Sequence, residues 1–119
     1  NITGSLTSYW LESSLKISPI EQVELLYKLQ TNKLNFSSKN INTVKTSICL
    51  SSSNKGILYG KTGTGRVNQQ DINGWFVGFI ESSNTNYFFA TNIQANTDST
   101  GSHAAKITLS ILSNLGIWQ

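Results

Sequence analysis

The pattern of hydrophobic positions divides the chain into a helical first half and a strand-rich second half. The clearest helix start is the stretch SPIEQVELLYKL, where Ser18 is a suitable N-cap, Pro19 suits the first helical position and Glu21 completes a capping box. One apolar face follows at helical spacing, formed by Ile20, Val23, Leu26, Tyr27 and Leu29 or Gln30. This face requires a partner surface.

Two further helices are predicted. A second helix from about Ser38 to Leu50 is rich in Asn and Ser, so packing must hold it in place. A final helix begins near 99–102, and Gly116 is a suitable stop. The apolar positions of these two helices are Ile41, Val44 and Ile48 in the second and Ala104, Ile107, Ile111 and Leu115 in the last.

Between these helices the pattern is that of strands. After SSSNKG, which has the composition of a loop, strands are predicted at 57–62, 74–82 and 86–94. The short spacer SNT joins the last two into an antiparallel hairpin. The strand at 74–82 is apolar on both faces, which predicts a central strand covered on each side, and Gly78 predicts a close neighbour there.

The predicted fold class is therefore α+β, with a three-stranded antiparallel sheet and the order α-α-β-β-β-α. Such a sheet needs cover on both faces, while the helices must also bury their own apolar sides. The first ten residues, NITGSLTSYW, have no regular pattern although they include Trp10. We expect residues preceding Asn1 to supply part of the sheet and core.

Composition excludes several functions. The net charge of +3 arises from only 13% charged residues, and Lys and Arg are scattered singly, which is not typical of nucleic-acid binding. No apolar run approaches the length of a membrane span, and no signal peptide begins the chain. One cysteine and one histidine make a metal site implausible, and Cys49, within TSICL, is predicted to be buried.

The stretch GILYGKTGTGRV carries the candidate chemistry. It is not a phosphate loop, because only three residues separate Gly56 from Gly60 and no helix is predicted after it. Glycines of a turn at a strand end are one interpretation. The other is the Lys-Thr-Gly triplet of penicillin-recognising serine enzymes, in which Lys61 supplies a cation, Thr62 a hydroxyl and Gly63 space for substrate against the backbone.

The flanking sequence favours the second interpretation. The stretches SYWLESSLKISPIEQVELLYKL, LYGKTGTG, NGWFVGFIE and YFFATNIQ, followed by a closing helix, resemble the C-terminal half of class D serine β-lactamases and of the related sensor domains of transmembrane β-lactam receptors. The likeness extends over essentially the whole chain. It implies that 1–119 is the C-terminal portion of a single penicillin-binding, transpeptidase-like domain, with a central antiparallel sheet between helices. It also implies a secreted protein or one at the outer face of the cell envelope.

The same resemblance implies residue roles. Lys61, Thr62 and Gly63 match the family triplet, and the backbone N–H of Thr64 would form half of the oxyanion hole. Trp10 would contact the carboxylated lysine that serves as general base, with Leu11 controlling access of water. No cofactor is implied beyond carbon dioxide or bicarbonate for that carboxylation.

Departures from the family are equally informative. The nucleophile motif Ser-x-x-Lys belongs before Trp10; its two matches here, Ser13–Lys16 and Ser52–Lys55, are predicted to be structural or exposed to solvent. The last helix lacks the arginine that many relatives use for the substrate carboxylate. The hydroxyls of Thr62 and Thr64 are expected to take that role, with Arg66 as a secondary candidate.

Two functions follow from the resemblance. The first is a class D β-lactamase that hydrolyses the β-lactam amide through an acylated serine, and the apolar Leu11 beside the general base favours it. The alternative is a receptor sensor domain that is acylated and does not turn over. Under either hypothesis the partners are β-lactam antibiotics and the preceding half of the domain, and this segment alone is predicted to be inactive.

Overall fold

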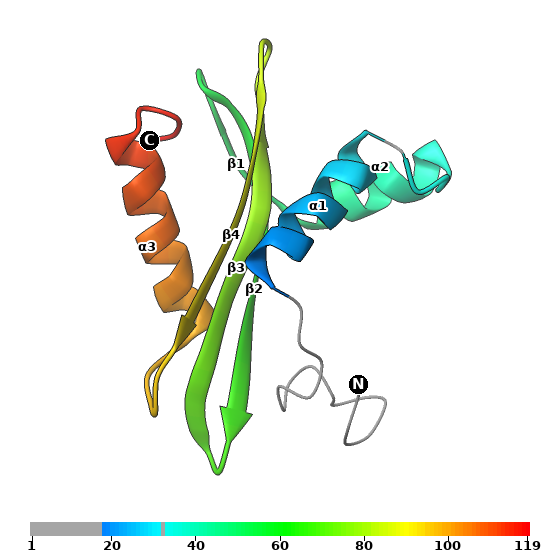
Figure 1. Ribbon diagram of the computed structural model, residues 1–119. Helices are drawn as coiled ribbons and strands as arrows, with labels where there is room; N and C mark the ends of the chain where they lie inside the picture. The colour runs from blue at the N-terminus through cyan, green and yellow to red at the C-terminus, as the bar shows by residue number, and fades with distance from the viewer. Residues whose placement is uncertain (1–17, 32) are drawn as a thin grey trace. The chain divides into compact units, whose positions relative to one another are not determined.

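The computed structural model describes residues 18–31 and 33–119, and within them it contains three helices and one four-stranded sheet (Figure 1). The elements are α1 (Pro19–Gln30), α2 (Ser38–Ser47), β1 (Cys49–Ser53), β2 (Gly56–Val67), β3 (Gln70–Glu81), β4 (Asn86–Gln94) and α3 (Gly101–Asn114). The strands lie in the order β1-β2-β3-β4. The α+β class is confirmed, but the expected count of three strands was wrong.

The additional strand is β1. The predicted second helix ends at Ser47 and not at Leu50, and the chain then pairs antiparallel with β2, from Cys49 opposite Tyr59 to Ser53 opposite Gly56. All five side chains of β1 are exposed, so backbone hydrogen bonding and not side-chain burial holds this strand. Cys49 is therefore exposed, and the prediction that it is buried was wrong.

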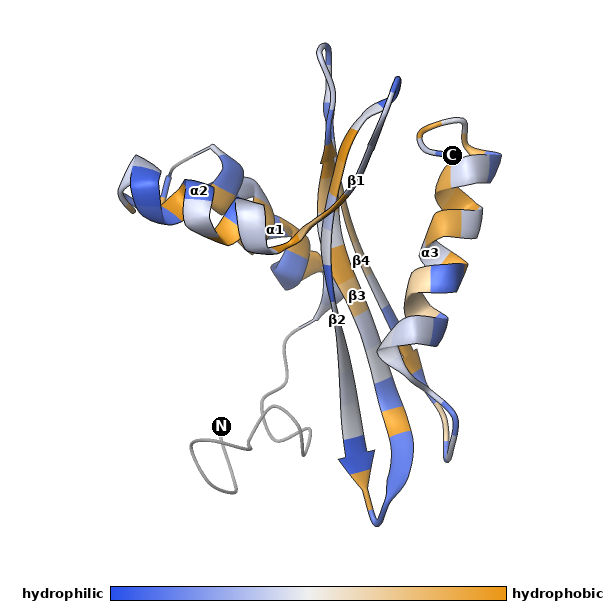
Figure 2. Ribbon diagram, turned by 180° about the vertical axis from the view of Figure 1, so that it is seen from behind, coloured by the Kyte–Doolittle hydropathy of each residue, from blue (hydrophilic) through white to orange (hydrophobic). Residues whose placement is uncertain are grey.

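β2 and β3 form a hairpin that was not predicted from the sequence. Residues 63–73, which lie between the strands predicted at 57–62 and 74–82, are mostly strand, and the turn consists of Asn68 and Gln69. Both have positive φ, 52° and 65°, as a two-residue hairpin turn of type I′ requires. This end of the hairpin is largely hydrophilic (Figure 2), which is why its sequence resembles a loop.

The β3–β4 hairpin is present where it was expected, and β3 is an inner strand of the sheet. Its residues Phe76, Phe79 and Ile80 are the largest fully buried side chains among the described residues. Gly78 does mark a close approach, because a methyl group added to it would lie 2.0 Å from the carbonyl oxygen of Tyr59. The central position and the close neighbour at Gly78 are therefore confirmed.

The described residues form two compact units. One contains Ser18, Thr62–Phe76 and Thr91–Gln119, and the other contains Pro19–Lys61 and Val77–Ala90. The division passes through β2, β3 and β4, so each unit holds a part of these three strands.

In the first unit, α3 buries Gly101, Ala104, Thr108 and Leu112. Thr108 donates to the carbonyl of Ala104, 2.8 Å away, and its hydroxyl also lies 2.6 Å from that of Thr91 in β4. The predicted apolar face was only partly right, because Ile111 and Leu115 are 51% and 65% exposed. The contact between α3 and β4 includes the threonine pair Thr108 and Thr91. A pattern of apolar residues does not reveal such a contact. Gly116 ends the helix region with a φ of 73°, as expected.

In the second unit, α1 begins at Pro19 as predicted, but neither α1 nor α2 contains a buried residue. Tyr27 of α1 packs edge-on against Phe88 of β4, with ring centres 5.7 Å apart. Ile20, expected on the buried face, is 72% exposed. No helix in the described ranges is both long and apolar enough to cross a membrane.

Candidate functional site

The Lys-Thr-Gly triplet lies in the middle of β2, and not in a turn or at the strand end. The residues before it, Leu58 to Gly60, are buried, whereas Lys61 and Thr62 are exposed and Gly63 and Thr64 are half-buried. The strand thus passes from core to surface at the triplet. Successive side chains of an extended strand point to opposite faces of the sheet, so Lys61 and Thr62, which are both exposed, lie on different faces of β2.

The start of α3 lies directly against this part of β2. The backbone N–H of Gly101 donates to the hydroxyl oxygen of Thr64 over 2.9 Å. A methyl group added to Gly101 would lie 2.8 Å from both the carbonyl oxygen of Gly63 and Cβ of Thr62. Only glycine permits this approach without a shift of backbone. Sequence reasoning missed Gly101; the available signal was a glycine directly after a capping threonine.

The loop before α3 is attached to the β2–β3 hairpin. Ser99, which is 4% exposed, donates its N–H to the carbonyl of Asp71 over 2.8 Å. The carbonyl of Thr100 lies so close to β3 that a methyl group on Gly74 would come within 2.2 Å of it. Thr100 is the N-cap of α3, and its hydroxyl accepts from the N–H of His103. The beginning of α3 is therefore fixed by contacts with both β2 and β3.

Arg66, the secondary candidate for the substrate carboxylate, has a partner inside the hairpin. Its Nε lies 2.7 Å from a carboxylate oxygen of Asp71, and its side chain is 63% exposed. The pair stabilises the hairpin only modestly, as exposed ion pairs do. A ligand carboxylate would have to compete with Asp71, so a role for Arg66 in binding stays a prediction.

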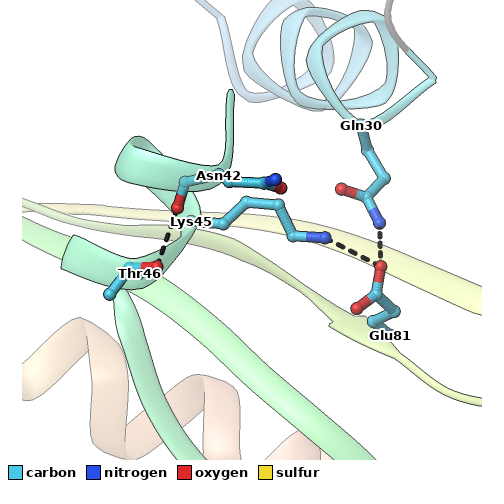
Figure 3. Close-up of polar contacts among 5 residues, drawn as sticks. All are labelled: Gln30, Asn42, Lys45, Thr46 and Glu81. Carbon is cyan, nitrogen blue, oxygen red and sulfur yellow. Dashed lines mark hydrogen bonds and ion pairs between the residues drawn. The ribbon is translucent and has the colours of Figure 1, made fainter. Parts of the chain in front are cut away.

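The second unit contains a different polar cluster, in which Glu81 of β3 accepts hydrogen bonds from Lys45 of α2, over 2.9 Å, and from Gln30 of α1 (Figure 3). The Lys45 ammonium lies 5.2 Å from the ring centre of Tyr59, which stacks on Phe79. This cluster ties both helices to β3, and its charges are directed at one another.

The titration behaviour of the cluster reflects this pairing. The hydrogen bond from Lys45 holds the pKa of Glu81 below its ordinary value, since it outweighs the opposing effect of burial. Burial raises the pKa of the Tyr59 hydroxyl, with Lys45 acting in the opposite direction. We interpret the cluster as structural.

The remaining predicted site residues, Trp10 and Leu11, lie outside the described residues, as does the match Ser13–Lys16. The other match begins at Ser52, which is exposed as predicted, but which lies in β1 and not in a loop. Among residues 18–31 and 33–119, no three His, Cys, Asp or Glu side chains gather as a metal-binding group. The roles assigned to Lys61, Thr62, Gly63 and Thr64 stay predictions.

Comparison with known families identifies the class. The model of the penicillin binding protein transpeptidase domain matches residues 1–113. The chain therefore belongs to the penicillin-binding protein transpeptidase domain family.

The individual relatives include a regulatory protein and a probable β-lactamase. Regulatory protein BlaR1 of Bacillus licheniformis is 48% identical over 110 residues, which are 92% of this chain and 18% of that protein. The probable β-lactamase YbxI of Bacillus subtilis (strain 168) is 39% identical over 117 residues, 98% of this chain and 42% of YbxI. The solved C-terminal domain of the Bacillus licheniformis BlaR penicillin-receptor superposes with a TM-score of 0.86 at 48% identity, covering 93% of this chain and 45% of that one.

These matches confirm the resemblance to class D β-lactamases and β-lactam receptors, and with it the β-lactamase/penicillin-binding type of α+β fold. The chain spans less than half the length of each of these relatives.

Proposed function

We propose that this chain forms the C-terminal portion of a sensor domain that is acylated by β-lactams and retains the acyl group. The observation that carries the proposal is the higher identity to a receptor, 48% with BlaR1, than to an enzyme, 39% with YbxI, over comparable parts of the chain. Leu11 favoured a hydrolase over a sensor, and the proposal reverses that preference. The acylation step is the same for both functions.

In the proposed reaction, the nucleophile is a serine of Ser-x-x-Lys in the preceding half of the domain. Its hydroxyl oxygen attacks the β-lactam carbonyl carbon and loses its proton to the general base, the ring C–N bond breaks, and the released nitrogen takes up that proton, leaving a serine ester. The exposed Lys61 would place positive charge near the nucleophile and ligand, and the Thr64 N–H would stabilise the oxyanion. The hydroxyls of Thr62 and Thr64 would bind the carboxylate of the ligand.

A class D hydrolase is the second candidate, and Leu11 is the specific observation that favours it. An apolar residue beside the general base would keep the lysine in the dry environment that its carboxylation requires. In that case a water molecule would attack the serine ester, release the opened product and restore the enzyme. Either protein would act outside the cell membrane, where both β-lactam receptors and secreted β-lactamases meet their ligand.

The test uses the full natural protein, a chromogenic β-lactam and mass spectrometry, with and without bicarbonate. We expect an absorbance change that corresponds to one opened β-lactam per protein, and a protein mass increased by the opened β-lactam. No sustained turnover is expected in either buffer. Sustained, bicarbonate-dependent turnover would establish the hydrolase instead. Absence of both the burst and the mass increase would contradict both candidates. The 119-residue segment alone is the control and should show neither signal.

A further inference from the structure

The contact between Gly101 and Thr64 has a consequence for ligand recognition. A threonine hydroxyl has one proton to donate and two lone pairs that accept. At Thr64 one lone pair already receives the N–H of Gly101. The hydroxyl keeps its own proton, which it can donate to a second group. An anion is a suitable acceptor for that proton, because hydrogen bonds to charged groups are the stronger ones.

The helix also makes the Thr64 hydroxyl a better donor. Gly101 is the first residue of α3, a helix of 14 residues, so its N–H is one of the groups at the positive end of the helix dipole. When this N–H donates to the hydroxyl oxygen, it polarises the O–H bond toward a negatively charged acceptor. The N–H is thereby occupied, so the ligand would meet the helix through Thr64 and not directly.

The geometry of this relay depends on the absence of a side chain at position 101. A methyl group there would come within 3.0 Å of Cβ of Thr62 and of both the N and O atoms of Gly63. Two of these three atoms belong to the backbone of β2, so α3 would have to withdraw. The loop before α3 is itself held by Asp71 and packed against Gly74, which limits any compensating movement.

We infer that Gly101 is a positioning residue for recognition of the carboxylate of the ligand, acting through the hydroxyl of Thr64. Many relatives bind the carboxylate with an arginine of the last helix, and STGSHAAKI contains no arginine. Gly101 at the start of α3 would support the same recognition through Thr64. This inference rests on the proposed function, since it concerns the same ligand site. It predicts that residue 101 affects the selection of anionic over neutral β-lactams more than it affects acylation as such.

The experiment compares a penicillin with its neutral methyl ester in the full natural protein, measuring the second-order acylation rate of each by mass spectrometry. Gly101→Ala should slow acylation by the free acid at least about 10-fold, the weight of one hydrogen bond to a charged group, and that by the ester less than about 3-fold. Thr64→Val should show the same selectivity, and Thr64→Ser should restore the rate for the acid.

Gly116→Ala is the matched control. It also adds a methyl group to a glycine near an end of α3, but that methyl group would meet no atom within 4 Å, and the only strain comes from the φ of 73°. It should lower stability and leave the ratio of the two acylation rates unchanged. A second readout is amide hydrogen exchange at Gly101, which should be faster in Thr64→Val, where the folded shape is preserved and only the acceptor is lost.

The outcomes separate the two proposals. If the wild-type protein is acylated by neither compound, the proposed function is wrong. If it is acylated, but Gly101→Ala slows both compounds equally or neither, the positioning role is wrong and the proposed function stands. Unchanged exchange at Gly101 in Thr64→Val would also overturn the inference.

Discussion

Two polar regions of this molecule are built in opposite ways. The cluster of Lys45, Glu81 and Gln30 consists of long side chains that satisfy one another, with a carboxylate held ionised by an ammonium. The region of Thr62–Thr64 and Gly101 consists of backbone groups, hydroxyls and glycines. Charges directed at each other stabilise a fold and leave little for a ligand. Lys61 and Thr62, at the start of the second region, are exposed to solvent, and the proposed ligand site lies there.

The largest expected effect tests the second region. Lys61→Ala in the full natural protein should reduce the acylation rate by about 10²- to 10³-fold, as removal of one preorganised electrostatic group does. Lys39→Ala, at an exposed position of α2, is the control and should leave the rate unchanged. Equal rates for wild-type protein and Lys61→Ala, measured by mass spectrometry, would show that the triplet is only a strand.

The next effect concerns the sheet in the unit that contains Lys45. Gly78→Ala should lower the free energy of unfolding by about 2 kcal/mol, because the added methyl group meets the Tyr59 carbonyl and cannot be accommodated without a backbone shift. Denaturant unfolding followed by tryptophan fluorescence measures the change. A midpoint equal to that of the wild type would mean that β2 and β3 are not so close at this point.

A smaller effect is expected for Glu81→Gln, which removes the acceptor charge of the cluster. We expect the free energy of unfolding at neutral pH to fall by about 1 kcal/mol, which is the upper end of the range for a partly exposed ion pair. Because the folded pKa of Glu81 lies below its ordinary value of 4.5, its contribution is complete above pH 4.5 and declines as the pH falls through the folded value. The difference between wild type and variant should therefore shrink in acid. A difference that persists at low pH would contradict the ion-pair explanation.

The smallest effect is expected at Cys49. Cys49→Ser should change the free energy of unfolding by less than about 0.5 kcal/mol, because the side chain is exposed on β1. The native protein should also react with a thiol reagent at the rate of an accessible cysteine. Slow labelling that accelerates only in denaturant would restore the earlier expectation of a buried residue.

The sequence predicted well those elements whose own residues show a capping, apolar or glycine pattern. Pro19 at the start of α1, the hairpin after Glu81 and the close approach at Gly78 all follow from capping, apolar runs and glycine chemistry. The strand β1 could not be found in this way, because its exposed serines show no alternation and only pairing with β2 makes it a strand. Tertiary pairing overrides local propensity at such positions.

The candidate site was predicted in part. The run from Lys61 to Thr64 was recognisable because a triplet in one strand is local in sequence. The contact between Thr64 and Gly101 joins residues that are 37 positions apart in the sequence. No local sequence pattern predicts a contact at that separation. The buried face of α3 was misjudged for a related reason, since Thr108 is buried through a hydroxyl contact with Thr91 that apolar periodicity does not register.

The polar strand β1 has a consequence for the behaviour of the protein in solution. Within residues 18–31 and 33–119 it lies at one edge of the four-stranded sheet, it is only five residues long, and its register with β2 is interrupted between Cys49 and Ser51. Short, irregular and hydrophilic edges are poor templates for the addition of strands from other molecules. The serines that concealed this strand from prediction are thus suited to limiting aggregation at that edge.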